Sequence, residues 1–514
     1  MLVNLVKKNF YRDSVYLMSL SNRIKSVGGV RDASVMMGTD ANKKLLSETG
    51  FFAKEGAAAS PNDLLICIDY AVGADIKTIS IEMEKLFCET AVPPSAGRRA
   101  NPGSVEEAVE VQPGSNMAVI SIPGAYVKYE AEKLLRSGIN LMIFSDNVPV
   151  EAEIFLKKLG VEKGLLVMGP DCGTAIINGV PLGFANVIRR GGIGIVGASG
   201  TGIQEVTTII HKNGEGITQA VGLGGRDLSK AIGGMMMLEG IKMLEADPET
   251  KVICVISKPP AAEIEAKVLD FIGKCRKPFV VNFIGGTAGR KDTGRVSFSS
   301  TLEGTALEAI SVLRGKKYVP SEKLPERLVK EALAERGKIK KGQKYLRGLF
   351  SGGTLCDEAM FVLSGAPGGI YSNIAVKQEL KLKNSRVSFR NTLVDLGDDE
   401  FTRGVPHPMI DFTVRNKRML DEAADEEVAV ILFDLVLGYG AHPDPAGAIL
   451  PAITEVRRIA ENRGMYISLV TSVCGTEQDP QDLDRQKGVL EKAGVKVLPS
   501  NVAAARFTEV ILNG

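Results

Sequence analysis

Tryptophan is absent from this 514-residue sequence, and aromatic residues make up only 5% of it. The hydrophobic cores must therefore be built from valine, isoleucine, leucine, methionine and alanine. Histidine occurs only three times, at His211, His407 and His442, so a mechanism that depends on an imidazole has few candidates. The seven cysteines are scattered and contain no C-x-x-C pair. This pattern argues against a disulfide framework or a metal site, and for a reducing compartment.

Long apolar runs are also missing. No stretch approaches membrane-spanning length, and the first residues, MLVNLVKKNFYRD, do not form a signal peptide. The net charge is only +2, and basic residues are not interleaved with aromatic ones, so nothing points to nucleic acid. We therefore predict a cytoplasmic protein that binds neither membrane nor nucleic acid. Its length predicts about three domains.

Short apolar segments alternate with segments of helical periodicity from Met1 to about Arg190. This alternation predicts an α/β domain over residues 1–190, with a parallel sheet covered by helices on both faces. The segment Val92–Gly103, rich in proline and glycine, is predicted to be a mobile surface loop. The strand candidates are Ala33–Met37, Leu64–Ile68, Met117–Ile122, Leu141–Phe144 and Leu165–Met168.

A glycine-rich stretch, Gly191–Glu205, organises the middle of the chain. A short apolar strand leads into a tight loop, and a helix follows. The first backbone N–H groups of such a helix are unpaired and favour an anion. We therefore predict that Ser199, Gly200 and Thr201 bind a phosphate. The alternative is an ordinary strand-to-helix turn, because short glycine patterns are common.

The same arrangement occurs again at Leu349–Met360. There the loop Ser351-Gly352-Gly353-Thr354 separates a strand end from a helix start, and we predict that these four residues also bind the phosphate. Residues 191–314 and 345–514 are predicted to be duplicated α/β domains, joined by a solvated, charged linker over residues 315–344. If the two domains face each other, their positive helix ends converge on one anion.

Other loops follow predicted strands at the edge where open α/β sheets bind ligands. Taken alone, each could be ordinary turn chemistry. Their residues are further candidates for binding substrate: Asp171, Gly224, Gly225, Arg226, Gly286, Thr287, Asp398, Gly475 and Thr476.

Several of these motifs resemble the α subunit of succinyl-CoA synthetase, notably Gly169-Pro-Asp-Cys-Gly, Gly194-Ile-Val-Gly-Ala-Ser-Gly-Thr and Val221-Gly-Leu-Gly-Gly-Arg-Asp. The C-terminal part resembles the ligase domain of the β subunit of the same enzyme. Further signatures identify the chain as a member of the FdrA family: Ser34-Val-Met-Met-Gly-Thr, Ser257-Lys-Pro-Pro, Asp395-Leu-Gly-Asp-Asp, Pro406-His-Pro-Met-Ile-Asp and Gly438-Tyr-Gly-Ala-His-Pro-Asp-Pro. The resemblance covers essentially the whole chain.

The resemblance implies a fold and two activities. The fold is a Rossmann-like, CoA-binding-type domain over residues 1–190, followed by two flavodoxin-like ligase domains over 191–314 and 345–514. One activity, carried by the family name, is acyl-CoA synthesis. The other is carbamoyl transfer between oxalurate or oxamate and phosphate or carbamoyl phosphate, in anaerobic allantoin breakdown. For this activity the chain would be one subunit of an oxamate carbamoyltransferase, acting with two other proteins.

Two departures from succinyl-CoA synthetase favour the transferase. All predicted domains are α/β sheets, which leaves no ATP-grasp domain. The ligase motif that should end in Gly-His-Ala-Gly reads Gly294-Arg-Val-Ser-Phe-Ser-Ser-Thr-Leu-Glu-Gly-Thr, so the phosphohistidine relay is missing. Carbamoyl transfer requires no cofactor, and CoA would be a vestigial or alternative ligand.

His407 is the candidate catalytic residue, because it lies in a loop after the acidic turn that follows the strand at Thr392–Leu396. It could polarise the substrate carbonyl, or it could be a structural histidine bonded to a carboxylate such as Asp411. His442 is predicted to lie in a turn. His211 lies within a predicted helix and is expected to have a structural role. Three hypotheses remain: a carbamoyltransferase subunit, an acyl-CoA ligase, and a non-catalytic scaffold subunit.

Overall fold

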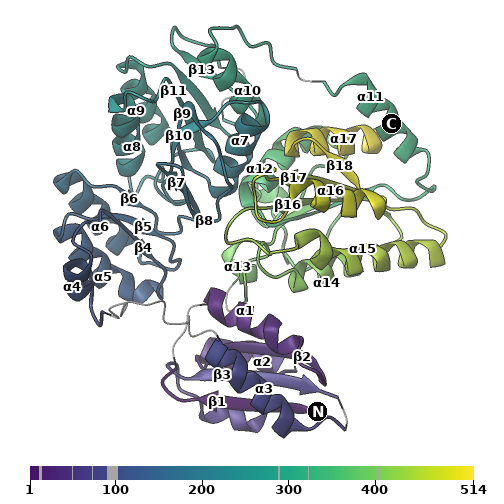
Figure 1. Cartoon of the computed structure of the whole chain (residues 1–514). Coiled ribbons are helices and arrows are strands. Elements are labelled where there is room, and N and C mark those ends of the chain that lie inside the picture. The colour runs from purple at the N-terminus through teal and green to yellow at the C-terminus, as the bar shows by residue number, and fades with distance from the viewer. Residues whose placement is uncertain are drawn as a thin grey trace. The chain divides into compact units, whose positions relative to one another are not determined.

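The computed structural model describes residues 1–10, 14–48, 50–71, 73–89, 102–286, 290–321, 323–402 and 405–513 (Figure 1). Most of the loop predicted over 92–103 lies outside these residues, as does Thr287. The chain forms two compact units. The first comprises Met1–Pro113 with Thr402–Pro406, and the second comprises Gly114–Phe401 with His407–Gly514.

The first unit contains an antiparallel sheet of order β1-β3-β2. The parallel sheet predicted across 1–190 is therefore wrong for this part of the chain. β3 is almost entirely buried because it is the central strand, so its continuous apolar run reads like a strand of a parallel sheet. The elements are β1 (Leu2–Lys7), α1 (Ser14–Lys25), β2 (Val30–Met37), α2 (Asp40–Glu48), a 3₁₀ turn (Lys54–Ala58), β3 (Leu64–Tyr70), α3 (Ile76–Glu89) and α4 (Val105–Val111).

The second unit begins with a small sheet that does follow the predicted alternation. Its three strands are parallel, in the order β4-β5-β6. The range 1–190 therefore does not form one sheet: it holds two small sheets, and its last part contributes two strands to a third. The elements are β4 (Met117–Ile120), α5 (Gly124–Arg136), β5 (Asn140–Ile143), α6 (Val150–Lys163) and β6 (Val167–Met168).

A seven-stranded sheet follows, with the order β13-β12-β11-β9-β10-β7-β8. Its five parallel strands have the flavodoxin-like order, in which the first strand lies between the second and the third. An antiparallel hairpin, β7–β8, extends the sheet beyond β10. The elements are β7 (Thr174–Ile177), β8 (Val180–Gly183), β9 (Arg190–Ala198), α7 (Gly200–Lys212), β10 (Ile217–Gly222), α8 (Met235–Ala246), β11 (Val252–Ser257), α9 (Ala262–Gly273), β12 (Phe279–Phe283), β13 (Val296–Phe298) and α10 (Leu302–Leu313).

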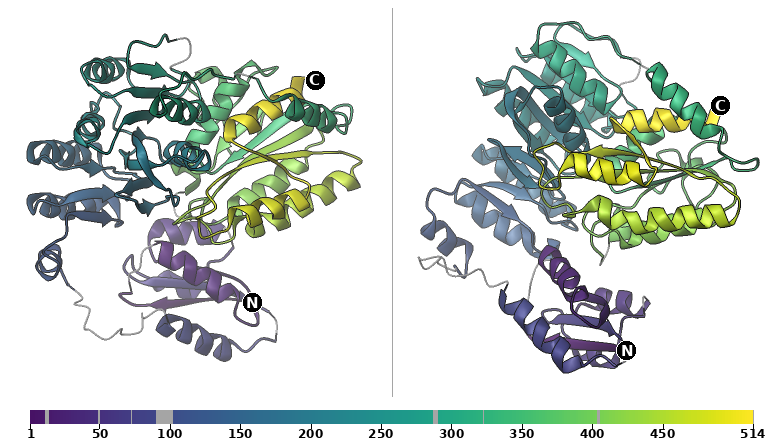
Figure 2. Two further views of the ribbon diagram at one scale, coloured as in Figure 1. Left: turned by 45° about the horizontal axis from the view of Figure 1, so that its top comes forward. Right: turned by 45° about the vertical axis from the view of Figure 1, so that its right-hand side comes forward.

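The C-terminal sheet repeats this order as β15-β14-β16-β17-β18. Both sheets carry helices on their two faces (Figure 2). The duplicated flavodoxin-like fold predicted for these two segments is present. The elements are β14 (Tyr345–Phe350), α12 (Gly353–Val362), two 3₁₀ turns (Leu363–Gly365 and Gln378–Leu380), β15 (Thr392–Asp395), α13 (Asp399–Thr402), α14 (Thr413–Ala423), β16 (Val428–Val436), α15 (Pro445–Asn462), β17 (Ser468–Cys474), α16 (Leu483–Lys492), β18 (Lys496–Leu498) and α17 (Asn501–Asn513).

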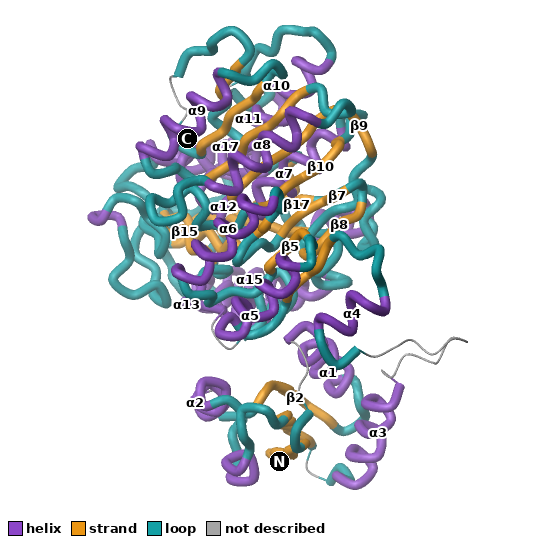
Figure 3. Tube along the Cα trace, turned by 90° about the vertical axis from the view of Figure 1, so that its left-hand side faces the viewer, coloured by secondary structure: helices purple, strands orange, loops and turns teal. Residues whose placement is uncertain are grey.

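The two duplicated domains share one continuous hydrophobic core, in which α7, α10, α12 and α17 pack together (Figure 3). The domains also exchange helix caps. Glu205 on α7 accepts the Asn501 N–H at 2.9 Å, at the start of α17. Glu358 on α12 accepts the Leu302 N–H at 2.6 Å, at the start of α10. This reciprocal pair of buried carboxylates relates the domains by an approximate two-fold symmetry and holds them face to face.

The linker is not simply solvated, contrary to the prediction. Its helix α11 (Glu326–Arg336) packs against α17, and Ala332 is fully buried in the shared core. The buried carboxylate of Glu335 accepts hydrogen bonds from the Tyr466 hydroxyl at 2.7 Å and the Ser468 hydroxyl at 2.9 Å. The high charge of the segment hid this apolar face. Within the described part of the chain, no helix combines the length and the apolar character required to span a bilayer.

Candidate functional site

The two glycine-rich loops meet at the N-termini of α7 and α12. The hydroxyl oxygens of Ser199 and Thr354 lie 2.8 Å apart, within hydrogen-bonding distance. Gly352 and Thr201 occupy the equivalent positions in the other pairing of the two loops. They are also closely packed, since a Cβ added to Gly352 would lie 2.9 Å from Thr201 Oγ1. The structure therefore brings together the predicted loops from both domains and leaves no room for a side chain at position 352.

The two helix ends differ in their electrostatic surroundings. Ahead of α12, the N–H groups of Ser351 and Gly352 donate to the carboxylate of Asp434 at 2.8 and 2.7 Å. The Ser351 hydroxyl donates to the same carboxylate at 3.0 Å. Asp434 is fully buried and pairs with Arg415 at 3.3 Å. A protein carboxylate therefore already occupies the anion position that we predicted for Ser351 and Gly352.

The N-terminus of α7 has no such cap, since the Ser199 side chain accepts no N–H from its own helix. A cation lies nearby instead. Ala198 at the end of β9 pairs with Ser257 at the end of β11, so the next residues, Ser199 and Lys258, leave adjacent strands at the same edge. Among the described residues no acceptor is found for the first N–H groups of α7, and the Lys258 ammonium group lies at the adjoining start of α12. These donors and the hydroxyls together suit a dianion.

Lys258 also links the two duplicated domains. Its ammonium group lies 2.9 Å from the Asp357 carboxylate on α12. Burial alone would lower the pKa of Lys258, but the charges of Asp357 and Asp395 outweigh it and raise the pKa. The side chain is nevertheless 44% exposed. Lys258 therefore stays protonated and open to a ligand at neutral pH.

Asp395 is the last residue of β15 and lies beside the first residue of α12. One carboxylate oxygen accepts the Gly397 N–H at 2.9 Å, and the other faces Gly353 and the Lys258 ammonium group. Burial raises the pKa of Asp395 to about 7, although Lys258 and the Gly397 N–H oppose this shift. Asp395 therefore changes its protonation state near neutral pH.

His407 lies next to Asp395, on the other side of Gly397. Its Nε2 is 2.8 Å from the position that a Cβ on Gly397 would take, and Asp395 Oδ1 is 3.2 Å from that same position. Burial, with a contribution from Arg415, lowers the pKa of His407 to about 4, so the ring is neutral at pH 7. Because Nδ1 accepts the Met409 N–H at 3.2 Å, the ring proton is assigned to Nε2.

The structural alternative for His407 is a bond to the Asp411 carboxylate. In the described residues this bond is not formed, and the Asp411 backbone N–H donates instead to the His407 carbonyl at 3.1 Å. The ring packs against Phe184, with centroids 5.4 Å apart. His407 is thus oriented by a backbone N–H and an aromatic ring, and its Nε2–H lies beside Gly397, in the neighbourhood of Asp395.

Asp171 belongs to the same group of charges. It is exposed to solvent, yet the protein around it desolvates the carboxylate. This burial, together with the charges of Asp399 and Asp146, raises the pKa of Asp171 to about 6, while Arg226 and Lys258 oppose the shift. Loops from three sheets therefore surround one group of ionisable side chains.

The other predicted site residues mainly hold loops in place. Arg226 pairs with Glu153 at 2.9 Å and donates to the Val148 carbonyl at 2.9 Å. Gly224 has φ +77°, and a Cβ there would collide with the Pro170 carbonyl, while Gly225 lies near Asp171. Asp398 accepts the Glu400 N–H at 3.0 Å within the start of α13.

Three other predicted residues do not belong to the group of ionisable residues described above: Gly475, Thr476 and Gly286. Gly475 packs against Leu437, and the Thr476 hydroxyl donates to the Val187 carbonyl at 2.8 Å. Gly286 is exposed after β12. Of the two remaining histidines, His211 is buried and bonds Glu477 at 2.7 Å, and His442 accepts the Asp444 N–H at 3.0 Å within a turn.

Sequence reasoning missed Lys258, Asp357 and Asp395 as site residues. Lys258 and Asp395 each lie at the end of a parallel strand, which is the rule that selected the other loops. Both also belong to quoted motifs, Ser257-Lys-Pro-Pro and Asp395-Leu-Gly-Asp-Asp. Asp357 gave no such signal, because it lies within a helix and becomes relevant only through its pairing with Lys258.

The described residues contain no group of three histidine, cysteine or acidic side chains arranged to hold a metal ion. The cysteines of the site loops, Cys172, Cys356 and Cys474, are free and buried. Burial raises the pKa of each thiol, so these thiols remain protonated and are poor nucleophiles.

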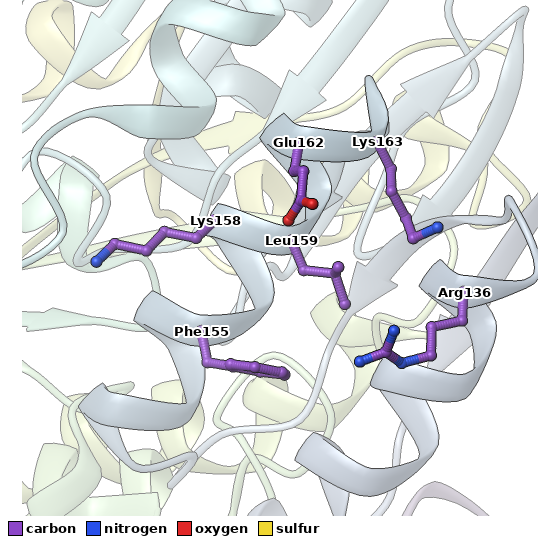
Figure 4. Close-up of a pocket in the computed structure, with 6 residues that line it drawn as sticks. All are labelled: Arg136, Phe155, Lys158, Leu159, Glu162 and Lys163. Carbon is purple, nitrogen blue, oxygen red and sulfur yellow. The ribbon is translucent and has the colours of Figure 1, made fainter.

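A pocket of about 560 Å³ lies elsewhere, on the outer faces of α5 and α6 (Figure 4). It is not at the carboxyl ends of the strands, and none of its residues belongs to the group of side chains described above. Its position on helix surfaces therefore does not favour it as the site of chemistry. Its lining residues are Arg136, Phe155, Lys158, Leu159, Glu162 and Lys163.

Three family models match parts of the chain. The AllF, heavy metal-associated domain matches residues 1–102, the CoA binding domain matches 189–285, and the CoA-ligase domain matches 349–511. The CoA-binding model thus covers the first duplicated domain, whereas the sequence analysis expected a CoA-binding type over 1–190.

One relative spans nearly the whole chain. The uncharacterized protein YahF of Escherichia coli K12 is 45% identical over 498 residues, covering 96% of each chain. The α subunit 1 of an ADP-forming succinate–CoA ligase from Archaeoglobus fulgidus is 27% identical over 219 residues, covering 41% of this chain and 72% of its own length. A dinucleotide-forming acetyl-coenzyme A synthetase from Candidatus Korarchaeum cryptofilum matches with a TM-score of 0.28 and 15% identity, covering 77% of this chain and 82% of its own.

Proposed function

Because the chain belongs to the FdrA family, we propose that it is the phosphate-binding subunit of an oxamate carbamoyltransferase-type complex. The reaction would exchange a carbamoyl group between oxalurate or oxamate and phosphate or carbamoyl phosphate, in anaerobic allantoin breakdown. Two other proteins would complete the complex. The match of residues 1–102 to an AllF domain supports this choice within the family.

The observation that carries the proposal is the set of hydrogen-bond donors that surrounds the N-terminus of α7. Phosphate would accept the N–H groups of Gly200 and Thr201 and the hydroxyls of Ser199 and Thr354, beside the ammonium group of Lys258. Gly353 would add the first N–H of α12. Ser351 and Gly352 were also predicted to bind phosphate, and in the proposed site they act indirectly, because Asp434 holds their donors.

Carbamoyl phosphate is already activated, so the protein has to bind a dianion, polarise a carbonyl and position an acceptor nitrogen. The neutral His407 ring would donate its Nε2–H to the carbamoyl oxygen as negative charge develops there. A neutral imidazole polarises the carbonyl without carrying a positive charge into a buried site. Neither role needs a cofactor.

Acyl-CoA ligation is the second candidate, supported by the CoA-binding and CoA-ligase models. Two features oppose it. The segment that would carry a phosphohistidine forms β13 and the start of α10, where the Thr301 hydroxyl caps the helix by accepting the Gly304 N–H at 3.0 Å. The glycine-rich loop after β10 is a poor cradle for a CoA pyrophosphate, because the Pro170 carbonyl fills the space above Gly224 and Asp227 is paired with the buried Lys157 at 2.8 Å.

Ligand binding to the full-length chain tests the proposal against its alternatives. In titration calorimetry, phosphate and carbamoyl phosphate are expected to compete for one site per chain, while CoA does not displace them. CoA binding without phosphate binding would favour the ligase. If neither ligand binds, the chain is a scaffold subunit and the proposal is wrong.

A further inference from the structure

Asp395 has a position that the proposed phosphate site leaves unexplained. It lies at the end of β15, is only 6% exposed, and adjoins both Gly353 and the Lys258 ammonium group. Its backbone is fixed, because its N–H donates to the Asn373 side-chain oxygen at 3.0 Å and its carbonyl accepts the Asn373 amide at 3.0 Å. The carboxylate is therefore held at the junction of the two duplicated domains.

The two oxygens of this carboxylate are used differently. Oδ1 accepts the Gly397 N–H at 2.9 Å. Among the described residues, Oδ2 has no hydrogen-bond donor and faces Gly353 at the start of α12. A carboxylate oxygen without a donor, in a side chain that is only 6% exposed and beside a partly exposed cation, is placed to exchange a proton with a bound substrate.

The proposed reaction requires one proton to move. A phosphate oxygen forms a bond to the carbamoyl carbon, and the bond between that carbon and the amide nitrogen breaks. Hydrogen phosphate loses its proton, and the departing nitrogen must gain one to leave as a neutral amide. The reaction needs no oxidant, reductant or additional reactant. It needs only a group that transfers this proton from the phosphate to the departing nitrogen.

We propose that Asp395 is this relay, donating a proton from Oδ2 to the departing nitrogen and recovering one from the phosphate. The inference rests on the proposed function and assigns a catalytic residue to it. In the opposite direction Asp395 removes the proton of the attacking amide nitrogen. Lys258 and His407 then keep fixed protonation states, one neutralising the phosphate and the other donating to the carbonyl.

The surrounding charges agree with this division of roles. Among the described residues, the charges that act most strongly on Asp395 are those of Lys258 after β11, Asp357 on α12 and Asp398 before α13, and His407 lies beside it as a neutral ring. The raised pKa of Lys258 and the lowered pKa of His407 place both titrations away from neutrality. Burial raises the pKa of Asp395 to about 7, so it can both give and accept a proton there.

The Asp395→Asn variant tests the relay, because asparagine can still accept the Gly397 N–H while it cannot transfer the proton. The matched control is Asp421→Asn, an exposed carboxylate on α14. Inorganic phosphate is titrated into each full-length chain at pH 7.5 in two buffers of different ionisation enthalpy. The wild type and Asp421→Asn are expected to take up a proton on binding, because phosphate next to Asp395 favours its protonated form. In Asp395→Asn this uptake is lost, while phosphate affinity is unchanged or rises by less than about fivefold, because no ionised carboxylate remains beside the anion.

Turnover in the assembled complex separates this inference from the proposed function. Asp395→Asn is expected to lower the rate of carbamoyl phosphate formation by at least about 100-fold, with little change in the KM for phosphate. An active wild-type complex together with an equally active Asp395→Asn complex overturns the relay alone. A wild-type complex that makes no carbamoyl phosphate overturns the proposed function, and a phosphate-linked proton uptake that survives in Asp395→Asn shows that Asp395 is not beside the phosphate.

Discussion

The hydroxyl groups of Ser199 and Thr354 lie 2.8 Å apart, although 155 positions separate them in the sequence. The contact joins two helix N-termini from duplicated domains. It also crowds the space between them, so the proposed phosphate site lies beside this pair, toward Lys258, rather than between the two loops. The two loops are not equivalent, because Asp434 holds the N–H groups of Ser351 and Gly352 ahead of α12, while the Ser199 side chain caps no N–H of α7.

Ser199 and Ser351 should therefore respond differently to replacement by alanine. Ser199→Ala removes a donor to a charged ligand, a loss of about 1.5–3 kcal/mol, so phosphate affinity should fall roughly 10- to 150-fold with little change in stability. Ser351→Ala removes a hydrogen bond to the buried Asp434 and should destabilise the fold by about 1–3 kcal/mol. Phosphate titration and thermal melting of both variants measure the difference. Equal effects of the two serines on affinity would contradict the asymmetric site.

Lys258 is expected to be the main cation for phosphate. Lys258→Met keeps much of the apolar stem but removes the charge, and should weaken phosphate binding at least tenfold, whereas Lys258→Arg retains part of the affinity. Lys230, an exposed lysine, provides the matched control as Lys230→Met. Calorimetry at low and high salt measures the phosphate affinity of each variant. Unchanged binding in Lys258→Met would place the phosphate elsewhere.

Glu358 should contribute strongly to stability because its two oxygens accept from different donors. One accepts the Leu302 N–H, and the other accepts the Asn501 amide at 2.8 Å. Glu358→Ala leaves both buried donors unpaired and should cost about 2–5 kcal/mol, while Glu358→Gln keeps one acceptor and costs less. Denaturant unfolding of the two variants measures the difference. A cost below about 1 kcal/mol for Glu358→Ala would show that the exchanged caps do not hold the domains together.

The raised pKa of Asp395 also predicts that the stability of the chain depends on pH. Its pKa of about 7 in the folded chain lies above the ordinary value for aspartate, so its contribution to stability is complete below about pH 4 and is lost as the pH rises through 7. Asp395→Asn removes this loss and should stabilise the chain relative to wild type more at pH 8 than at pH 5, by at most about 3 kcal/mol. Unfolding midpoints at both pH values test the sign. A stability difference that does not vary with pH would contradict a raised pKa.

Local sequence patterns predicted the elements of the duplicated domains well, because each strand is an apolar run and each glycine-rich loop marks a helix start. In the first 113 residues they located β2 and β3 but missed β1 and gave the wrong strand direction, since the buried central strand β3 has the same apolar run as a parallel strand. They also missed how α11 packs, because Ala332 is a small residue within a charged helix.

The site could be predicted only in part. The loops around Ser199 and Thr354 were found because their glycines and hydroxyls are adjacent in sequence. The capping of Ser351 by Asp434 could not be found, since Asp434 lies within a buried strand and its role depends on how β14 and β16 pair. The same holds for the pairing of Lys258 with Asp357, which joins the two domains.

Formation of carbamoyl phosphate by the assembled complex tests the central claim most directly. The chain is co-expressed with its neighbouring subunits, and the purified complex is incubated with oxalurate and inorganic phosphate. Phosphorus NMR should then show carbamoyl phosphate appearing as phosphate is consumed, without ATP or CoA, at a rate that falls at least tenfold when the subunit carries Lys258→Met. A complex that leaves phosphate unchanged but forms an acyl-CoA from ATP, CoA and a carboxylic acid would contradict the account.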